Sequence, residues 1–168
     1  SIEVGSAVMN ILCNGGPMAA AERCASFATL HGLQDEQKRK LHVGFSAGRF
    51  DFMNRAYGLV PRNATEQAMG PALKGKIFAE AVEVFLRLLR GDILESANVE
   101  PQRINRQTFR SDDHWLAVQR AAKTDTEEIT LEPRYQFEKI KIVPQSWRRE
   151  LIQPVIGSHD PQQQIAAN

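Results

Sequence analysis

The sequence has few cysteines and no long apolar run. Its two cysteines, Cys13 and Cys24, have no histidine or further cysteine at metal-ligand spacing, so we expect neither a disulfide framework nor a metal site. No apolar stretch approaches the ~20 residues that a membrane helix needs, and the first residues lack the basic and apolar regions of a signal peptide. We therefore expect a cytoplasmic protein without a membrane partner.

An excess of charge of either sign is also missing. Twenty-one basic residues face 20 acidic ones, which gives a formal net charge of +1. Nucleic-acid binding normally needs a basic surface, so we expect no nucleic-acid partner. The 42% hydrophobic and 24% charged residues are typical of a globular protein, and 168 residues suffice for a single domain, here 1–168. A small-molecule ligand is the expected partner.

Apolar patterns predict strands that alternate with long helices. Residues 2–12 have the composition of a buried strand, a Gly-rich turn follows, and residues 17–32 repeat at helical spacing. Residues 41–45 predict a second buried strand, and residues 71–90 an amphipathic helix. Residues 154–156 predict another strand. Such alternation indicates an α/β protein with parallel strands joined by right-handed crossovers.

Two further segments are harder to interpret. Residues 92–136 lose their periodicity, which predicts an irregular excursion with a short hairpin. Residues 137–143 alternate apolar and charged side chains, which predicts a half-exposed strand. The few strand-to-helix units cannot close an eight-stranded barrel, so we expect some strand partners to lie elsewhere.

Ligands of parallel α/β proteins bind at the carboxyl ends of the strands, here residues 10–16, 46–51 and 157–160. The turn Gly157-Ser158-His159-Asp160-Pro161 starts a predicted helix, whose free N–H groups attract a phosphate. An N-cap by Ser158 or Asp160, without a ligand, explains the same residues equally well.

Gly44-Phe45-Ser46-Ala47-Gly48 has the glycine spacing of a tight strand exit. It lacks the third glycine of a dinucleotide fingerprint, so we expect a turn with positive φ at Gly48. Neither Ser46 nor Ser158 lies in a Gly-x-Ser-x-Gly elbow, so neither is expected to be a hydrolytic nucleophile. His42 alternates into a strand face and is expected to be a core residue.

The order and spacing of several segments resemble one known family. These segments are Val4-Gly5-Ser6-Ala7-Val8, residues 40–51, Tyr57-Gly58, residues 78–84 and Pro154-Val155-Ile156-Gly157-Ser158. Together they resemble the bacterial-luciferase-like flavin-dependent monooxygenases over nearly the whole chain. The resemblance rests on their order, because no single motif is diagnostic.

The resemblance implies a TIM-type (β/α)8 barrel, of which this chain is the central portion, with the irregular insertion at about 92–136. It also implies that the protein binds reduced FMN, or a deazaflavin as in some members, and acts with oxygen on a small organic substrate. A separate flavin reductase and a homodimer are further expectations from the family.

The resemblance also implies roles for residues at the strand ends. Ala7 and Val8 correspond to the strand backbone at the flavin ring, and Ser46 to a position near its reactive face. Gly157-Ser158-His159 corresponds to the phosphate-binding turn. Ala47 stands where luciferases carry an arginine that reaches the phosphate. The family's catalytic histidine belongs to an earlier strand, so no catalytic residue is assigned.

Two alternatives stay open. One is a non-catalytic flavin-binding member of the same family, which the missing arginine favours. The other is an unrelated α/β enzyme with a phosphate-bearing ligand, because fold alone does not decide function.

Overall fold

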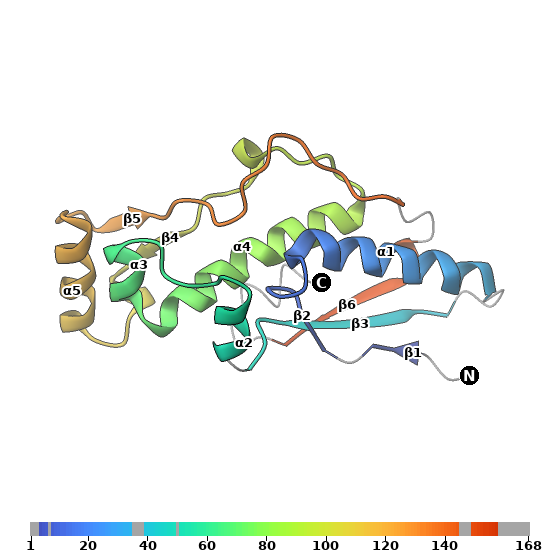
Figure 1. Ribbon diagram of the computed structural model, residues 1–168, viewed down its shortest axis with the longest axis horizontal. Helices are drawn as coiled ribbons and strands as arrows, with labels where there is room; N and C mark the ends of the chain where they lie inside the picture. Colours follow the sequence, from blue (N-terminus) through green and yellow to red (C-terminus); the bar gives the residue numbers. More distant parts are fainter. Residues whose placement is uncertain (1–3, 7, 35–38, 50, 145–148, 158–168) are drawn as a thin grey trace.

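The structure is a computed structural model, and it describes residues 4–6, 8–34, 39–49, 51–144 and 149–157. It is a mixed α/β arrangement in which two long helices lie on one face of a small parallel sheet (Figure 1). The α/β class expected from the sequence is confirmed.

The sheet is built around strand β3 (Leu41–Ser46). Strands β1 (Val4–Gly5) and β2 (Met9–Asn10) pair with its first and last residues, and β6 (Ile152–Ile156) pairs along Leu41 to Phe45. All of these pairings are parallel. Within the described part of residues 2–12, the predicted strand forms two short pieces, β1 and β2, along one edge of β3.

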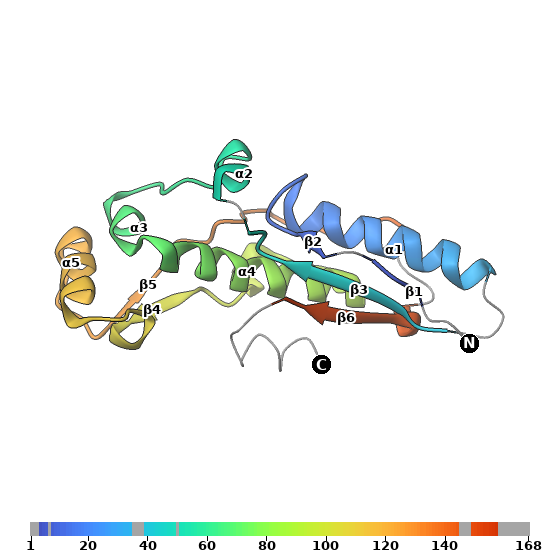
Figure 2. The same cartoon turned by 90° about the horizontal axis from the view of Figure 1, so that it is seen from below.

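Helices α1 (Gly16–Gln34) and α4 (Pro71–Arg90) cover one face of this sheet (Figures 1 and 2). Alanines and a cysteine form the buried side of α1, and these small side chains let α1 approach α4 closely. Pro71 occupies the first position of α4, and Gly91 ends it in the left-handed conformation with φ +96°. Both predicted helices are confirmed.

Aromatic packing joins the sheet to α4. Phe45 and Phe85 are fully buried, and their ring centroids lie 4.9 Å apart at an interplanar angle of 49°. Such tilted aromatic pairs contribute about 1 kcal/mol beyond the burial of their area. Val43, two residues before Phe45, is buried on the same side of β3. The hydrophobic core therefore lies between this sheet face and the two helices, and it continues along α4 to buried residues of the excursion such as Ile104 and Val118.

The predicted irregular excursion contains more regular structure than expected. Strands β4 (Arg103–Asn105) and β5 (Glu128–Thr130) pair antiparallel, as the predicted hairpin requires, but an unpredicted helix, α5 (Asp112–Ala122), lies between them. The Ser111 side chain caps α5 by accepting from the His114 N–H. Trp115 and Val118 are buried, and α5 packs against α3 (Ala64–Met69).

The strand predicted at residues 137–143 is wrong. This segment forms only an isolated bridge between Leu94 and Ile140. The main chain of Phe137 bonds instead to Ser96, whose hydroxyl accepts from the Phe137 N–H and donates to its carbonyl, both at 2.6 Å. The alternation of apolar and charged residues arises because Phe137, Ile140 and Ile142 pack on the core without a neighbouring strand.

The remaining elements are α2 (Asp51–Ala56) and three 3-10 turns, Ser96–Asn98, Arg106–Thr108 and Arg149–Leu151.

A buried charge cluster fastens the excursion to the helices. Glu66, 3% exposed, accepts from Arg62 at 2.7 Å and from Arg134 at 2.9 Å. Glu80, 5% exposed, accepts from the backbone N–H groups of Arg134 and Tyr135 at 2.9 and 2.8 Å. The segment around Arg134 is therefore bonded to both α3 and α4.

The two carboxylates of this cluster have opposite pKa shifts. Burial alone would raise the pKa of Glu66, but hydrogen bonds from Arg62 and the charge of Arg134 outweigh it and lower this pKa. Burial dominates at Glu80 and raises its pKa, although the two backbone N–H groups oppose the shift. Glu66 therefore stabilises the fold as a carboxylate.

We expect Glu66→Gln to lower the free energy of unfolding by about 3 kcal/mol at neutral pH, because it leaves Arg134 buried without its carboxylate partner. The folded-state pKa of Glu66 is lowered, so its stabilisation is present above the ordinary glutamate pKa and is lost as the pH falls through the folded value. The difference between wild type and variant should therefore shrink between about pH 7 and about pH 3.

Urea unfolding at several pH values measures this difference. Glu138→Gln is the matched control, since Glu138 is exposed, and we expect a change within about 0.5 kcal/mol. An equal effect of both substitutions, or a Glu66 effect independent of pH, would contradict the assignment.

Candidate functional site

The sheet face opposite the helices is open at its carboxyl edge. Side chains alternate along a strand, and Val43 and Phe45 point into the core, so Gly44 and Ser46 belong to the other face. Figure 2 looks onto this face, where β3 and β6 lie in front of α4. No helix in the described ranges covers it. Val8 and Val155 remain 61% and 48% exposed, so apolar surface is accessible here.

Three of the predicted site residues come together at this edge. The Gly157 N–H donates to the Phe45 carbonyl at 2.8 Å, which brings the end of β6 beside Ser46. A Cβ atom built on Gly157 would lie 3.3 Å from the Ser46 Cβ and 3.9 Å from the Val8 Cγ1. Val8, Ser46 and Gly157 are thus direct neighbours, although they are far apart in the sequence.

The other predicted site residues are placed differently. Ala47 packs against the hydrophobic core, so its side chain does not join the open face. Ala7, Ser158 and His159 lie outside the described residues. His42, expected to be a core residue, is only half buried, and its alternation with Val43 places it on the open face.

A polar network fixes the strand ends behind this edge. The Asn10 Nδ2 donates to the Asn54 Oδ1 at 3.1 Å and to the Cys13 Sγ at 3.0 Å, while its Oδ1 accepts from the Leu12 N–H at 3.0 Å. Asn54, 5% exposed, donates to the Ala47 carbonyl at 3.4 Å. The network joins β2, the exit of β3 and α2, and so it positions the segment that carries Ser46.

Gly48 is required where β3 leaves the sheet. Its φ of +71° confirms the predicted turn with positive φ. A Cβ atom on Gly48 would overlap the Asn10 Nδ2 and lie 2.7 Å from the Asn10 Cγ. Sequence reasoning selected Gly48 but missed Asn54, because α2 is too short to give a periodic signal.

The two thiols of the chain, Cys13 just after β2 and Cys24 within α1, are poor nucleophiles. Burial raises the pKa of Cys13, although the charge of Lys74 opposes the shift. Burial raises the pKa of Cys24 to about 11. Both thiols are therefore protonated at neutral pH, and the edge offers an apolar surface with hydrogen-bonding groups rather than a thiolate.

The comparisons with known proteins give no family. No protein-family model, curated protein or solved structure matches the chain. Among the described residues, no three His, Cys, Asp or Glu side chains gather where they could hold a metal ion. A search of the same residues finds no helix with the length and apolar character to cross a membrane.

We expect Gly48→Ala to destabilise the fold more than Gly58→Ala. Both glycines have positive φ, +71° and +77°, so both variants lose about 1 kcal/mol or more from left-handed strain. Nothing lies within 4 Å of a Cβ on Gly58, whereas Gly48→Ala also displaces Asn10. Loss of two Asn10 hydrogen bonds adds about 2 kcal/mol.

Free energies of unfolding from urea titration measure both variants, and Gly58→Ala serves as the control for backbone strain. Equal losses would show that the Asn10 network does not hold the β3 exit.

Proposed function

We propose that this chain is the central portion of a TIM-type barrel that binds reduced FMN, and that the protein is a flavin-dependent monooxygenase acting with oxygen on a small organic substrate. The observation that supports the proposal is the convergence of Val8, Ser46 and Gly157 at the carboxyl edge of a parallel sheet. Barrel enzymes bind their ligands at this edge.

The topology is compatible with a barrel. The strands lie in sequence order across the sheet, and the helices between them cover one face only, as in the wall of a barrel (Figure 1). The exposed side of α1 carries Phe27, Leu30 and Leu33, which are 62%, 57% and 66% exposed. A neighbouring barrel helix would cover such an apolar stripe.

The described residues at the edge offer an apolar surface to a planar ring. Val8 and Val155 offer apolar surface, and Gly157 has no side chain to block approach to the backbone. The Gly157 N–H already donates to the Phe45 carbonyl, so Ser158 and His159 would bind the phosphate. Bound flavin would supply the redox chemistry with oxygen, while these residues bind it, orient it and exclude water.

The proposal extends to a deazaflavin, since the proposed contacts are to the ring face and the phosphate. Reduced flavin would be delivered by a separate reductase. The protein would act in the cytoplasm as a homodimer. A non-catalytic flavin-binding protein is the second candidate. The alanine at position 47 favours it, because alanine cannot supply the positive charge that the luciferases place there.

We expect FMN to bind more tightly than riboflavin, which lacks the phosphate, and Ser158→Ala to remove much of that difference. Val8→Glu should weaken both ligands about tenfold, because it places a carboxylate against the ring. Flavin fluorescence titration under oxidising and reducing conditions measures these affinities.

Val143→Glu is the control for Val8→Glu, since Val143 is 69% exposed but lies outside the open face. The flavin hypothesis fails if neither the folded chain nor a longer protein that contains it binds flavin. Oxygen consumption that depends on a substrate would separate the monooxygenase from the non-catalytic binder.

A further inference from the structure

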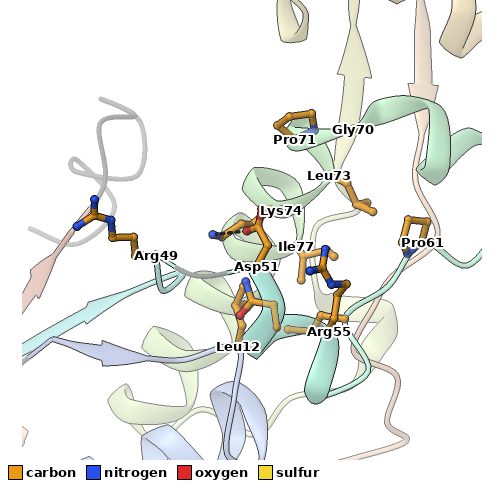
Figure 3. Close-up of a pocket in the computed structure, with 12 residues that line it drawn as sticks. Leu12, Arg49, Asp51, Arg55, Pro61, Gly70, Pro71, Leu73, Lys74 and Ile77 are labelled. Carbon is orange, nitrogen blue, oxygen red and sulfur yellow. Dashed lines mark hydrogen bonds and ion pairs between the residues drawn. The ribbon is translucent and has the colours of Figure 1, made fainter.

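A cavity lies beside the strand ends, between α2 and the first turns of α4 (Figure 3). Its volume of about 420 Å³ is in the range of small-molecule sites. Val8, Ser46 and Gly157 do not line it, so it is separate from the proposed flavin surface.

Cationic side chains outnumber acidic ones around this cavity. Arg49, Arg55 and Lys74 line it together with a single carboxylate, Asp51. Figure 3 shows the ion pair of Lys74 and Asp51 at the centre, with Arg55 beside Ile77. Arg49 lies farther away, on the side of the ion pair opposite Arg55. The local charge therefore favours an anion.

The ion pair inside the cavity does not exclude such a ligand. Lys74 Nζ lies 2.9 Å from the Asp51 Oδ1, but Asp51 is 71% exposed, and exposed pairs contribute no more than about 1 kcal/mol. A bound anion can therefore share or take over the Lys74 ammonium. Within the described ranges, the Arg55 guanidinium donates no hydrogen bond, so its N–H groups remain available to a ligand.

The floor of the cavity is apolar. Leu12, Leu73 and Ile77 are 4%, 7% and 6% exposed, and Leu59 packs beside them on the core. An inorganic anion would leave the apolar floor exposed to water, whereas a ligand with an apolar body would cover it. The combination of cations and apolar floor selects a ligand that carries both features.

We propose that the cavity between α2 and α4 binds a small carboxylate with a compact apolar body. Its carboxylate lies between Arg55 and Lys74, and its apolar body lies on Leu12, Leu73 and Ile77. Arginine and carboxylate match in geometry through paired N–H donors, which makes Arg55 the main determinant of charge recognition. This inference is independent of the flavin proposal, because no flavin contact enters it.

Benzoate and its neutral isostere benzamide form the matched pair of probes, titrated against the 168-residue chain and followed by methyl NMR. We expect benzoate to bind with a dissociation constant of about 1 mM, and benzamide about tenfold more weakly. Benzoate should shift the methyl signals of Leu12, Leu59, Leu73 and Ile77. Inorganic phosphate should bind more weakly than benzoate, because it cannot cover the floor.

Arg55→Gln should weaken benzoate about tenfold, through the loss of a charge-assisted hydrogen bond, without changing the affinity for benzamide. Lys74→Gln is the second variant and should also weaken benzoate. Arg110→Gln is the control, since Arg110 is exposed and does not line the cavity. Circular dichroism confirms that each variant is folded.

The proposal is overturned if the folded wild type does not bind benzoate, or if benzamide binds equally well. It is also overturned if both cavity variants behave like Arg110→Gln, or if the shifted methyl groups belong to the exposed stripe of α1. Phosphate binding as tight as that of benzoate would rule out the role of the apolar floor. None of these results bears on flavin binding, so the two proposals fail separately.

Discussion

The position of every residue at the open edge depends on the pairing of β3 along both of its sides. β1 and β2 bond to one side and β6 to the other, and the last of these bonds, from Gly157 to Phe45, sets Gly157 beside Ser46. Parallel pairing is possible only because α1 and α4 return the chain over the same face, where Phe45 packs on Phe85. The contact between Phe45 and Phe85 holds β3 against α4, and so it also fixes the residues on the open face of the same strand.

Charge has a different role from apolar packing in this chain. Apolar contacts build the sheet and its two helices and also pack the excursion, whose Leu94, Ile104 and Trp115 belong to the same core. Glu66 and Glu80 add hydrogen bonds, which they accept from residues 62 and 134–135. These carboxylates are buried, so they stabilise the fold only while their partners remain in place. These directional bonds add to the apolar packing and restrict the segment around Arg134 to one arrangement on α3 and α4.

Sequence patterns predicted the long elements well, because an apolar stripe on 20 residues of α4 or a buried run such as β3 has few alternative explanations. They failed where tertiary contacts decide. The helix α5 has a cap and acidic first turn but only two buried side chains, Trp115 and Val118, and residues 137–143 alternate without a partner strand. Ser46 and Gly157 could be selected as strand ends, and Val8 through the family resemblance, but their mutual distances and the role of Asn54 required the pairing register.

Asn54 connects the two surfaces that the structure offers to ligands. Its side chain bonds to Asn10 and to the Ala47 carbonyl behind the open edge, and it also lines the cavity between α2 and α4. Because α2 carries Asn54, Arg55 and Asp51, one short helix sets both the exit of β3 and the charged wall of the cavity. A six-residue helix has too few internal hydrogen bonds to be stable alone, so its geometry is fixed by this buried amide. The two sites are therefore chemically separate but share one structural support.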